Sequence, residues 1–188
     1  KALGGIIREA GGIPVIAESP GGLYSELYLR HVYNVCGMTE AARQAGIELN
    51  FDTSEVDVDY PDGMFLKKVR AIKPLVEANV VINLPKLKTH GQMVYTGAVK
   101  NMFGAIPGVR KAEYHFRMSG YSEFANTLID IHCCLKPTLN IMDAVVGMEG
   151  RGPTSGNPRS IGLILGSRDA FALDLAALYI MGIDPRKV

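Results

Sequence analysis

The sequence has no tryptophan, only three cysteines and no long apolar run. Cys36, Cys133 and Cys134 form an odd set with an adjacent pair, which does not suit a disulfide framework and favours a reducing compartment. No apolar stretch reaches the ~18 residues typical of a membrane span. The chain also starts inside a helical pattern, at Lys1, without Met or a signal peptide. We therefore expect a cytoplasmic protein with no membrane contact, and a fragment of a longer chain.

The sequence also lacks an excess of charge of either sign. Twenty Lys and Arg against 19 Asp and Glu leave a net charge of +1, so no global field attracts nucleic acid and any anion site must be local. The basic residues of the central region lack the interleaved aromatic side chains of a single-strand binder; they are Lys86, Lys88, Lys100, Arg110 and Lys111. The Walker A pattern is absent too. Nucleic acid is therefore not an expected partner, and the oligomeric state stays open.

Helical and strand patterns alternate along the 188 residues. Short apolar runs indicate strands near 13–19, 47–51, 79–84, 137–146 and 160–166, and amphipathic segments between them indicate helices. Such alternation is typical of an α/β protein whose sheet is mainly parallel. We predict a single α/β domain over residues 1–188, with three layers and helices flanking the sheet.

A β-hairpin interrupts this alternation. The segment from Glu55 to Arg70 alternates with period two on both sides of Pro61-Asp62-Gly63, which is a turn sequence. We therefore expect residues 55–70 to form a small hairpin appendage within the domain.

Polar residues are concentrated where the expected strand 79–84 ends. Lys86, Lys88 and His90 alternate in an extended segment, so their side chains should point the same way. Two nearby ammonium groups suit a carboxylate or phosphate, and ligands of parallel sheets bind at the carboxyl ends of strands. We therefore assign Lys86 to ligand binding and Lys88 and His90 to catalysis, with His90 as acid, base or metal ligand. A solvated basic turn is the alternative.

Two further segments are candidates for the same site. If residues 91–102 are helical, Lys100 and Asn101 lie near the carboxyl end of the helix. The alternative is a lysine that only interacts with the helix dipole, which is common at this position. The loop 147–159 holds Gly147, Gly150 and Arg151, whose backbone N–H groups and guanidinium could hold an anion. A flexible surface loop is the alternative.

The loop 147–159 should also lie near the lysines. In a parallel sheet the ends of successive strands meet at one edge, so we expect this loop to fold back toward Lys86–His90. We further expect Glu149 to contact a lysine there, so that the loop acts as a lid.

Three acidic residues have separate expected roles. Asp143, at the end of an apolar run, could ligate a metal or orient His90. Asp169 should begin the last helix. Asp174 lies among apolar helical neighbours, where a buried carboxylate needs partners, so a structural role is favoured over a catalytic one.

The cysteines do not suggest a cofactor in this chain. Consecutive helical residues diverge by about 100°, so His132, Cys133 and Cys134 cannot converge on one ion. Three cysteines also fall short of the four thiolates that usually hold an iron–sulfur cluster. We expect neither a metal nor a cluster here.

Three long segments resemble one known family. They are INLPKLKTHGQMVYTGAVKNMFGAIPG, IMDAVVGMEGRGPTSGNPR and LILGSRDAFALDLAALYIMGIDP, and they are similar to the family of domain of unknown function 362 (DUF362). The family's opening lysine-proline-asparagine strand is missing, as is the ferredoxin-like cysteine segment that members often carry. The resemblance implies redox-linked proteins, with a 4Fe-4S cluster in such a segment of the full-length protein. It implies no reaction and no residue roles, although Lys86, Lys88, His90, Lys100, Asn101, Asp143, Gly147 and Asp174 match marked positions.

Three functional hypotheses follow. The first is an enzyme module that binds a small anion at the carboxyl edge of the sheet, linked to a ferredoxin-like segment. The second is a non-catalytic domain whose basic cluster docks an iron–sulfur partner. The third is a metal-dependent site at His90 and Asp143. The sequence does not decide whether the protein is an enzyme.

Overall fold

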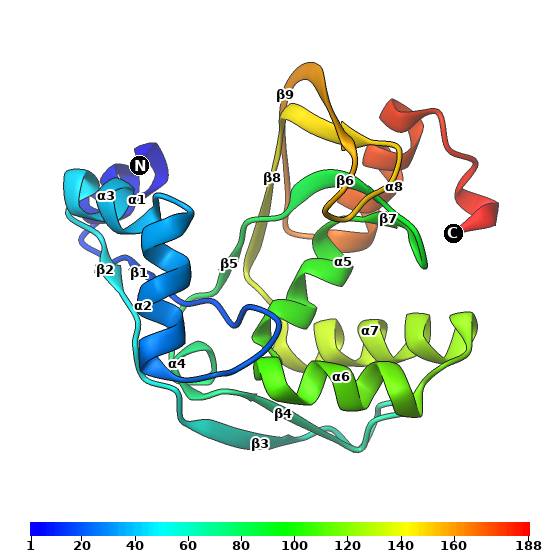
Figure 1. Cartoon of the computed structure of the whole chain (residues 1–188), viewed down its shortest axis with the longest axis horizontal. Coiled ribbons are helices and arrows are strands. Elements are labelled where there is room, and N and C mark those ends of the chain that lie inside the picture. Colours follow the sequence, from blue (N-terminus) through cyan, green and yellow to red (C-terminus); the bar gives the residue numbers. More distant parts are fainter. The chain divides into compact units, whose positions relative to one another are not determined.

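A computed structural model describes all 188 residues, which form two compact units. Unit 1 consists of Lys1–Asp57, Arg70–Ala78 and Gly104–Glu113. Unit 2 consists of Val58–Val69, Asn79–Phe103 and Tyr114–Val188. Figure 1 labels the elements of both units along the chain.

Unit 1 is built on one pair of short parallel strands. Its elements are α1 (Ala2–Glu9), β1 (Val15–Ile16), α2 (Glu26–Val35), α3 (Met38–Ala45), β2 (Glu48–Leu49) and α4 (Lys73–Val76). β1 and β2 pair in parallel, with Val15 opposite Glu48. The connection between them carries α2 and α3, because parallel strands need a long crossover. Gly46 ends α3 in the left-handed conformation, at φ 60°, as is common for a glycine at the end of a helix.

Unit 2 contains a five-stranded mixed sheet organised around one long strand. The strands are β5 (Ile82–Asn83), β6 (Lys86–His90), β7 (Val94–Thr96), β8 (Leu139–Glu149) and β9 (Asn157–Ser167). β5 and then β6 pair in parallel with β8, whereas β9 pairs with β8 antiparallel along nearly its whole length. β8 therefore carries β5 and β6 on one edge and β9 on the other.

Three α-helices complete unit 2: α5 (Ala98–Asn101), α7 (Tyr121–Leu135) and α8 (Ala170–Met181). α8 begins at Asp169, whose carboxylate accepts the backbone N–H of Phe171 and Ala172, as expected for a cap. The core joins α8 to the sheet through buried residues of both; they are Leu87, Tyr95, Ala98, Met142, Ala144, Ala170, Leu173, Ala177 and Leu178. Short helical turns follow at η1 (Met102–Ala105) and η2 (Pro185–Lys187).

The predicted fold class is confirmed, and a helix considered for residues 91–102 is not formed. The chain is α/β, with parallel pairs β1–β2, β5–β8 and β6–β8 and a hairpin appendage. Residues 86–90 form the strand β6 by pairing with β8, in keeping with the extended segment expected there. Residues 91–102 are not one helix: a turn and β7 come first, and α5 begins only at Ala98.

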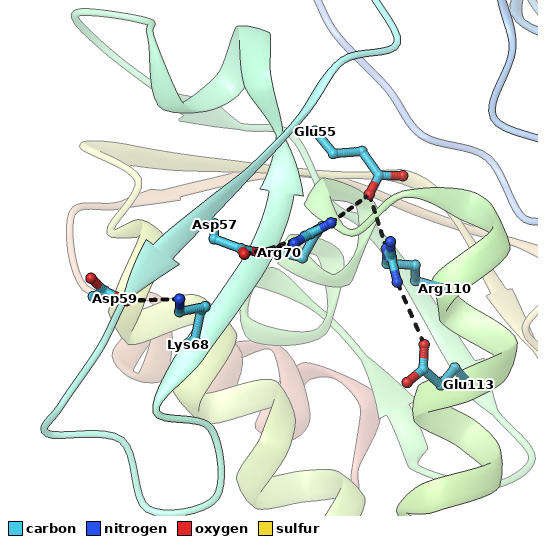
Figure 2. A network of polar contacts seen from close by, with 7 residues as sticks. All are labelled: Glu55, Asp57, Asp59, Lys68, Arg70, Arg110 and Glu113. Carbon is cyan, nitrogen blue, oxygen red and sulfur yellow. Dashed lines mark hydrogen bonds and ion pairs between the residues drawn. The ribbon is translucent and has the colours of Figure 1, made fainter.

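The hairpin consists of β3 (Glu55–Asp59) and β4 (Lys68–Ile72), which form a two-stranded sheet. In unit 1 the guanidinium of Arg70 contacts both carboxylate oxygens of Asp57, at 2.5 and 2.6 Å (Figure 2). Glu55 accepts from Arg110 at 2.9 Å in the same network. Arg110 belongs to α6 (Gly108–Arg117). In unit 2 Lys68 lies 3.5 Å from Asp59. These pairs are partly or largely exposed, so each contributes little to stability.

The hairpin tip is held by one buried carboxylate. Asp130 of α7 is 5% exposed, and its two oxygens accept the backbone N–H groups of Met64, Phe65 and Leu66 at 2.6–2.9 Å. Three charge-assisted bonds to one carboxylate fix the tip against α7.

We predict that Asp130→Ala lowers the free energy of unfolding by about 2–4 kcal/mol, because three backbone donors lose a charged acceptor. Urea denaturation followed by circular dichroism measures this. Asp62→Ala is the matched control, since Asp62 is an exposed acid of the same hairpin, and its effect should stay within about 0.5 kcal/mol. Equal effects of the two substitutions would contradict the assignment.

Candidate functional site

The three alternating polar residues lie on β6 as the pattern predicted. Leu87, between Lys86 and Lys88, is 1% exposed and belongs to the core, whereas Lys86 is exposed and Lys88 and His90 are half-buried. Because side chains alternate along a strand, Lys86, Lys88 and His90 share the face opposite Leu87. β6 then turns into β7, with His90 opposite Val94.

The His90 ring holds this turn together. Its Nδ1 accepts the backbone N–H of Gln92 at 3.2 Å and of Met93 at 3.1 Å. A ring nitrogen that accepts is unprotonated, so the proton of the neutral ring sits on Nε2. Nε2–H is therefore available as a hydrogen-bond donor, which favours anion binding over a role as general base.

The groups that shift the pKa of His90 are all basic. Burial of the ring, then Lys100, Lys88 and His115, lower the pKa of His90 to about 4. None of the charges that shift this pKa is a carboxylate. His90 is therefore neutral at pH 7 within a locally basic region.

Lys100 is held beside two aromatic rings. It lies on α5, with Nζ 5.8 Å from the ring centroid of Phe103 and 5.9 Å from that of Phe124. His115 stacks on Phe124 with centroids 4.5 Å apart. Ammonium groups are attracted to ring faces, so these rings restrict where the Lys100 charge can be. Phe103, Phe124 and His115 were not predicted as site residues, because their proximity depends on how α7 packs.

Lys86 differs from its neighbours because it has an acidic partner. It lies opposite Asp143 in the β6–β8 register, and its Nζ contacts Asp143 Oδ2 at 2.7 Å. This contact, with a further bond from the backbone N–H of Val145, lowers the pKa of Asp143. Lys86 and Asp143 thus neutralise each other, which makes Lys86 a weaker anion ligand than Lys88.

The loop 147–159 folds back onto β6, as predicted. Thr89 donates its hydroxyl to the carbonyl of Gly150 at 3.0 Å, and Gly91 N–H donates to the carbonyl of Gly152 at 3.0 Å. A Cβ on Gly152 would collide with the carbonyl of Thr89, so only glycine allows this approach.

The expected lid contact is wrong. Glu149 binds Arg159 at 2.9 Å and not a lysine, because much of the loop is an extension of the antiparallel β8–β9 pair. Gly147 lies within this sheet, where an added Cβ would lie 3.1 Å from the carbonyl of Leu87. Gly150 begins the turn at φ 79°, and Arg151 is exposed.

Asn101 belongs to a buried amide network. Its Nδ2 donates to Asn83 Oδ1 at 2.7 Å, and Asn83 donates to Asn140 Oδ1 at 2.9 Å and to the carbonyl of Ala98 at 2.8 Å. Asn140 donates in turn to the carbonyl of Ser167. These bonds tie β5, β8 and α5 together, and Asn101, which is itself exposed, joins the buried amides through its side-chain N–H.

Asp174 has the structural role that the sequence favoured. Its carboxylate accepts the hydroxyl of Tyr95 at 3.0 Å and the backbone N–H groups of Ala98 and Val99 at 2.6 and 3.0 Å. Burial raises the pKa of Asp174 although these bonds lower it. A Cβ on Gly97 would collide with both Tyr95 and Asp174, which explains the glycine there.

A cavity of about 310 Å³ lies beside this carboxylate. Lys100 and Met93 line it, together with Tyr95, Asp174 and apolar side chains of α7 and α8. Lys86, Lys88 and His90 do not line it. Lys100 thus lies both in the wall of the cavity and in the basic region at His90.

No group of three or more His, Cys, Asp or Glu side chains has an arrangement that could hold a metal ion. The three cysteines are free. None of the helices is long and apolar enough to cross a membrane.

Comparison with known proteins identifies the family. The model of the family described as "Domain of unknown function (DUF362)" matches residues 1–179. The "Thylakoid-associated protein sll1697" of Synechocystis sp. (strain ATCC 27184 / PCC 6803 / Kazusa) is 33% identical over all 188 residues, and the chain spans 57% of the length of that relative. No solved structure matches.

We predict that the protein loses stability as the pH falls from about 6.5 to 4, partly through His90. The folded state lowers the pKa of His90 to about 4, so in this window the unfolded chain binds more protons and acid favours unfolding. After allowance for the half-buried ring, the His90 contribution is about 1–2 kcal/mol.

His90→Asn tests this, because Asn keeps an acceptor for the turn but does not titrate. The variant should show a smaller loss of unfolding free energy between pH 7 and 4.5. The pKa values of His115 and His132 are also lowered, so His132→Asn serves as the comparison for a distant histidine. An unchanged pH slope in His90→Asn would refute the prediction.

Proposed function

The chain belongs to the DUF362 family, and from this premise we propose that unit 2 binds a small anion, a carboxylate or phosphate, at Lys88, His90 and Lys100. The observation that carries the proposal is the environment of His90: the groups that shift its pKa are Lys100, Lys88 and His115, and none of these is acidic. A bound anion would offset this repulsion between like charges.

Each of the three residues would contribute differently. Lys88 makes no ion pair and is half-buried, so its ammonium is available and partly desolvated. Lys100 would add a second charge from α5. The neutral His90 ring would donate Nε2–H, since Nδ1 is held by the turn. A neutral donor together with two ammonium groups suits an oxyanion, because each charge-assisted bond is about twice as strong as a neutral one.

The structure favours this proposal over a docking surface for an iron–sulfur partner. A docking surface needs several exposed charges, but the exposed Lys86 is neutralised by Asp143 and the other two basic residues are half-buried. A metal site at His90 and Asp143 is also less favoured, because Asp143 binds Lys86 and His90 Nδ1 accepts backbone N–H groups.

The cellular compartment and the redox link are also part of the proposal. We infer a reducing, cytoplasmic compartment from the free cysteines. If a ferredoxin-like segment with a 4Fe-4S cluster occurs in the full-length protein, electrons could reach a ligand bound at Lys88. The relative from Synechocystis is named for its association with thylakoids, which suggests a test of membrane association for this protein too.

We predict that phosphate or acetate binds to the purified protein and that Lys88→Gln weakens this binding at least tenfold, because one of two ammonium groups is lost. Isothermal titration calorimetry at low salt measures the affinity. Lys68→Gln is the matched control: it removes the same charge from the hairpin, where Lys68 pairs with Asp59, and should leave binding unchanged.

The pKa of His90 gives a second readout. Bound anion should raise it from about 4, since negative charge favours the imidazolium. Titration of the His90 ring signals by NMR with and without phosphate measures this shift. No binding of either anion, together with an unshifted His90, would disprove the proposed function.

A further inference from the structure

The cavity next to Lys100 has mainly apolar walls, and apart from Lys100 its polar residues form what we call its floor. Side chains of Leu128 and Ile129 on α7 and of Phe171 and Leu175 on α8 line it. The polar floor is Asp174 with Tyr95, and Asp174 already accepts the Tyr95 hydroxyl and two backbone N–H groups. A ligand group entering this cavity therefore meets apolar walls and a carboxylate whose hydrogen bonds are largely satisfied.

Two residues join the cavity to the basic region. Met93 donates its backbone N–H to His90 Nδ1, and its side chain lines the cavity and is 6% exposed. Lys100 lines the cavity and acts on the charge of His90. The apolar cavity and the basic region are therefore neighbouring parts of unit 2 with shared residues.

We propose that the ligand is an amphipathic anion, with a carboxylate or phosphate head at Lys88, His90 and Lys100 and an apolar body in the cavity between α7 and α8. This inference rests on the proposed function and adds the chemical class of the ligand. A polar anion such as a short hydroxy acid would leave the apolar walls uncovered, whereas an apolar body removes them from water.

The volume of the cavity limits the size of the apolar part of the ligand. An apolar cavity of about 150 Å³ holds one benzene ring. The 310 Å³ cavity is about twice as large, so it accommodates a body of roughly two fused rings or a medium-length alkyl chain. Ring walls from Tyr95, Tyr121 and Phe171 suit an aromatic body, because aromatic pairs are stabilised beyond their buried area.

The test compares three probes titrated into the purified protein by calorimetry. Acetate has only the anionic head, uncharged 2-naphthalenemethanol has only the apolar body, and 2-naphthoate has both. We expect 2-naphthoate to bind at least tenfold more tightly than either acetate, which lacks the body, or 2-naphthalenemethanol, which lacks the charge.

Substitutions test the binding of the anionic head and of the apolar body separately. Ala125 lines the cavity, so Ala125→Phe should fill it and reduce 2-naphthoate affinity to about that of acetate, without changing the affinity for phosphate. Ala176→Phe adds the same ring to an exposed position of α8 outside the cavity and should change neither. Lys88→Gln should weaken 2-naphthoate and phosphate alike. The ligand series on the unaltered protein decides the question even if Ala125→Phe does not fold.

The outcomes distinguish this inference from the proposed function. If phosphate and acetate bind but 2-naphthoate is no tighter, the amphipathic class is wrong and the anion site stands. If 2-naphthoate binds tightly and Lys88→Gln has no effect, the cavity takes apolar molecules independently of the anion site, which overturns the inference. If no anion binds, the proposed function fails and the inference fails with it.

Discussion

The parallel pairing of residues 82–90 with β8 is the constraint on which the candidate site depends. Asn83 lies opposite Asn140, and their side chains bond to each other in the buried amide network. A shift of this pairing by one residue would bury Lys86 and expose Leu87, because side chains alternate along a strand. The unpaired amides would then be left in the core at a cost of about 1–3 kcal/mol each. The amide pair thus fixes the register that puts Lys86 opposite Asp143 and places Lys88 and His90 on the same face of β6 as Lys86.

This register also divides the basic residues into two classes. Lys86 is neutralised by Asp143, whereas Lys88 and Lys100 both lower the pKa of His90. Val94, opposite His90, adopts φ 60°, which is unfavourable for a β-branched residue by about 1–2 kcal/mol. Backbone strain of this kind is a feature that folded proteins keep mainly at functional sites.

The sheet also explains why the loop 147–159 is not a lid. Pairing of β8 with β9 continues to Glu149 and Asn157, so only a short turn is left between the strands. That turn is attached to β6 by the hydroxyl of Thr89 and the N–H of Gly91. The glycines allow close packing of backbone against backbone, and a mobile cover is not needed to account for them.

Local chemistry in the chain was enough to predict much of this protein. Period-two and helical patterns predicted the α/β class, the hairpin 55–70 and the Asp169 cap, because each depends on neighbours within a few residues. Alternation of Lys86, Lys88 and His90 predicted their common face for the same reason.

Long-range packing decided the rest. The partner of Lys86, the three N–H donors on Asp130 and the aromatic rings beside Lys100 come from segments tens of residues away, and nothing in the local pattern specifies which segment will be adjacent. The helix considered for 91–102 is not formed for this reason, since pairing with β6 makes Val94–Thr96 a strand. Which charges are neutralised and which remain exposed to a ligand is therefore a property of strand register and helix packing, because electrostatic energy depends on distances that only the folded chain defines.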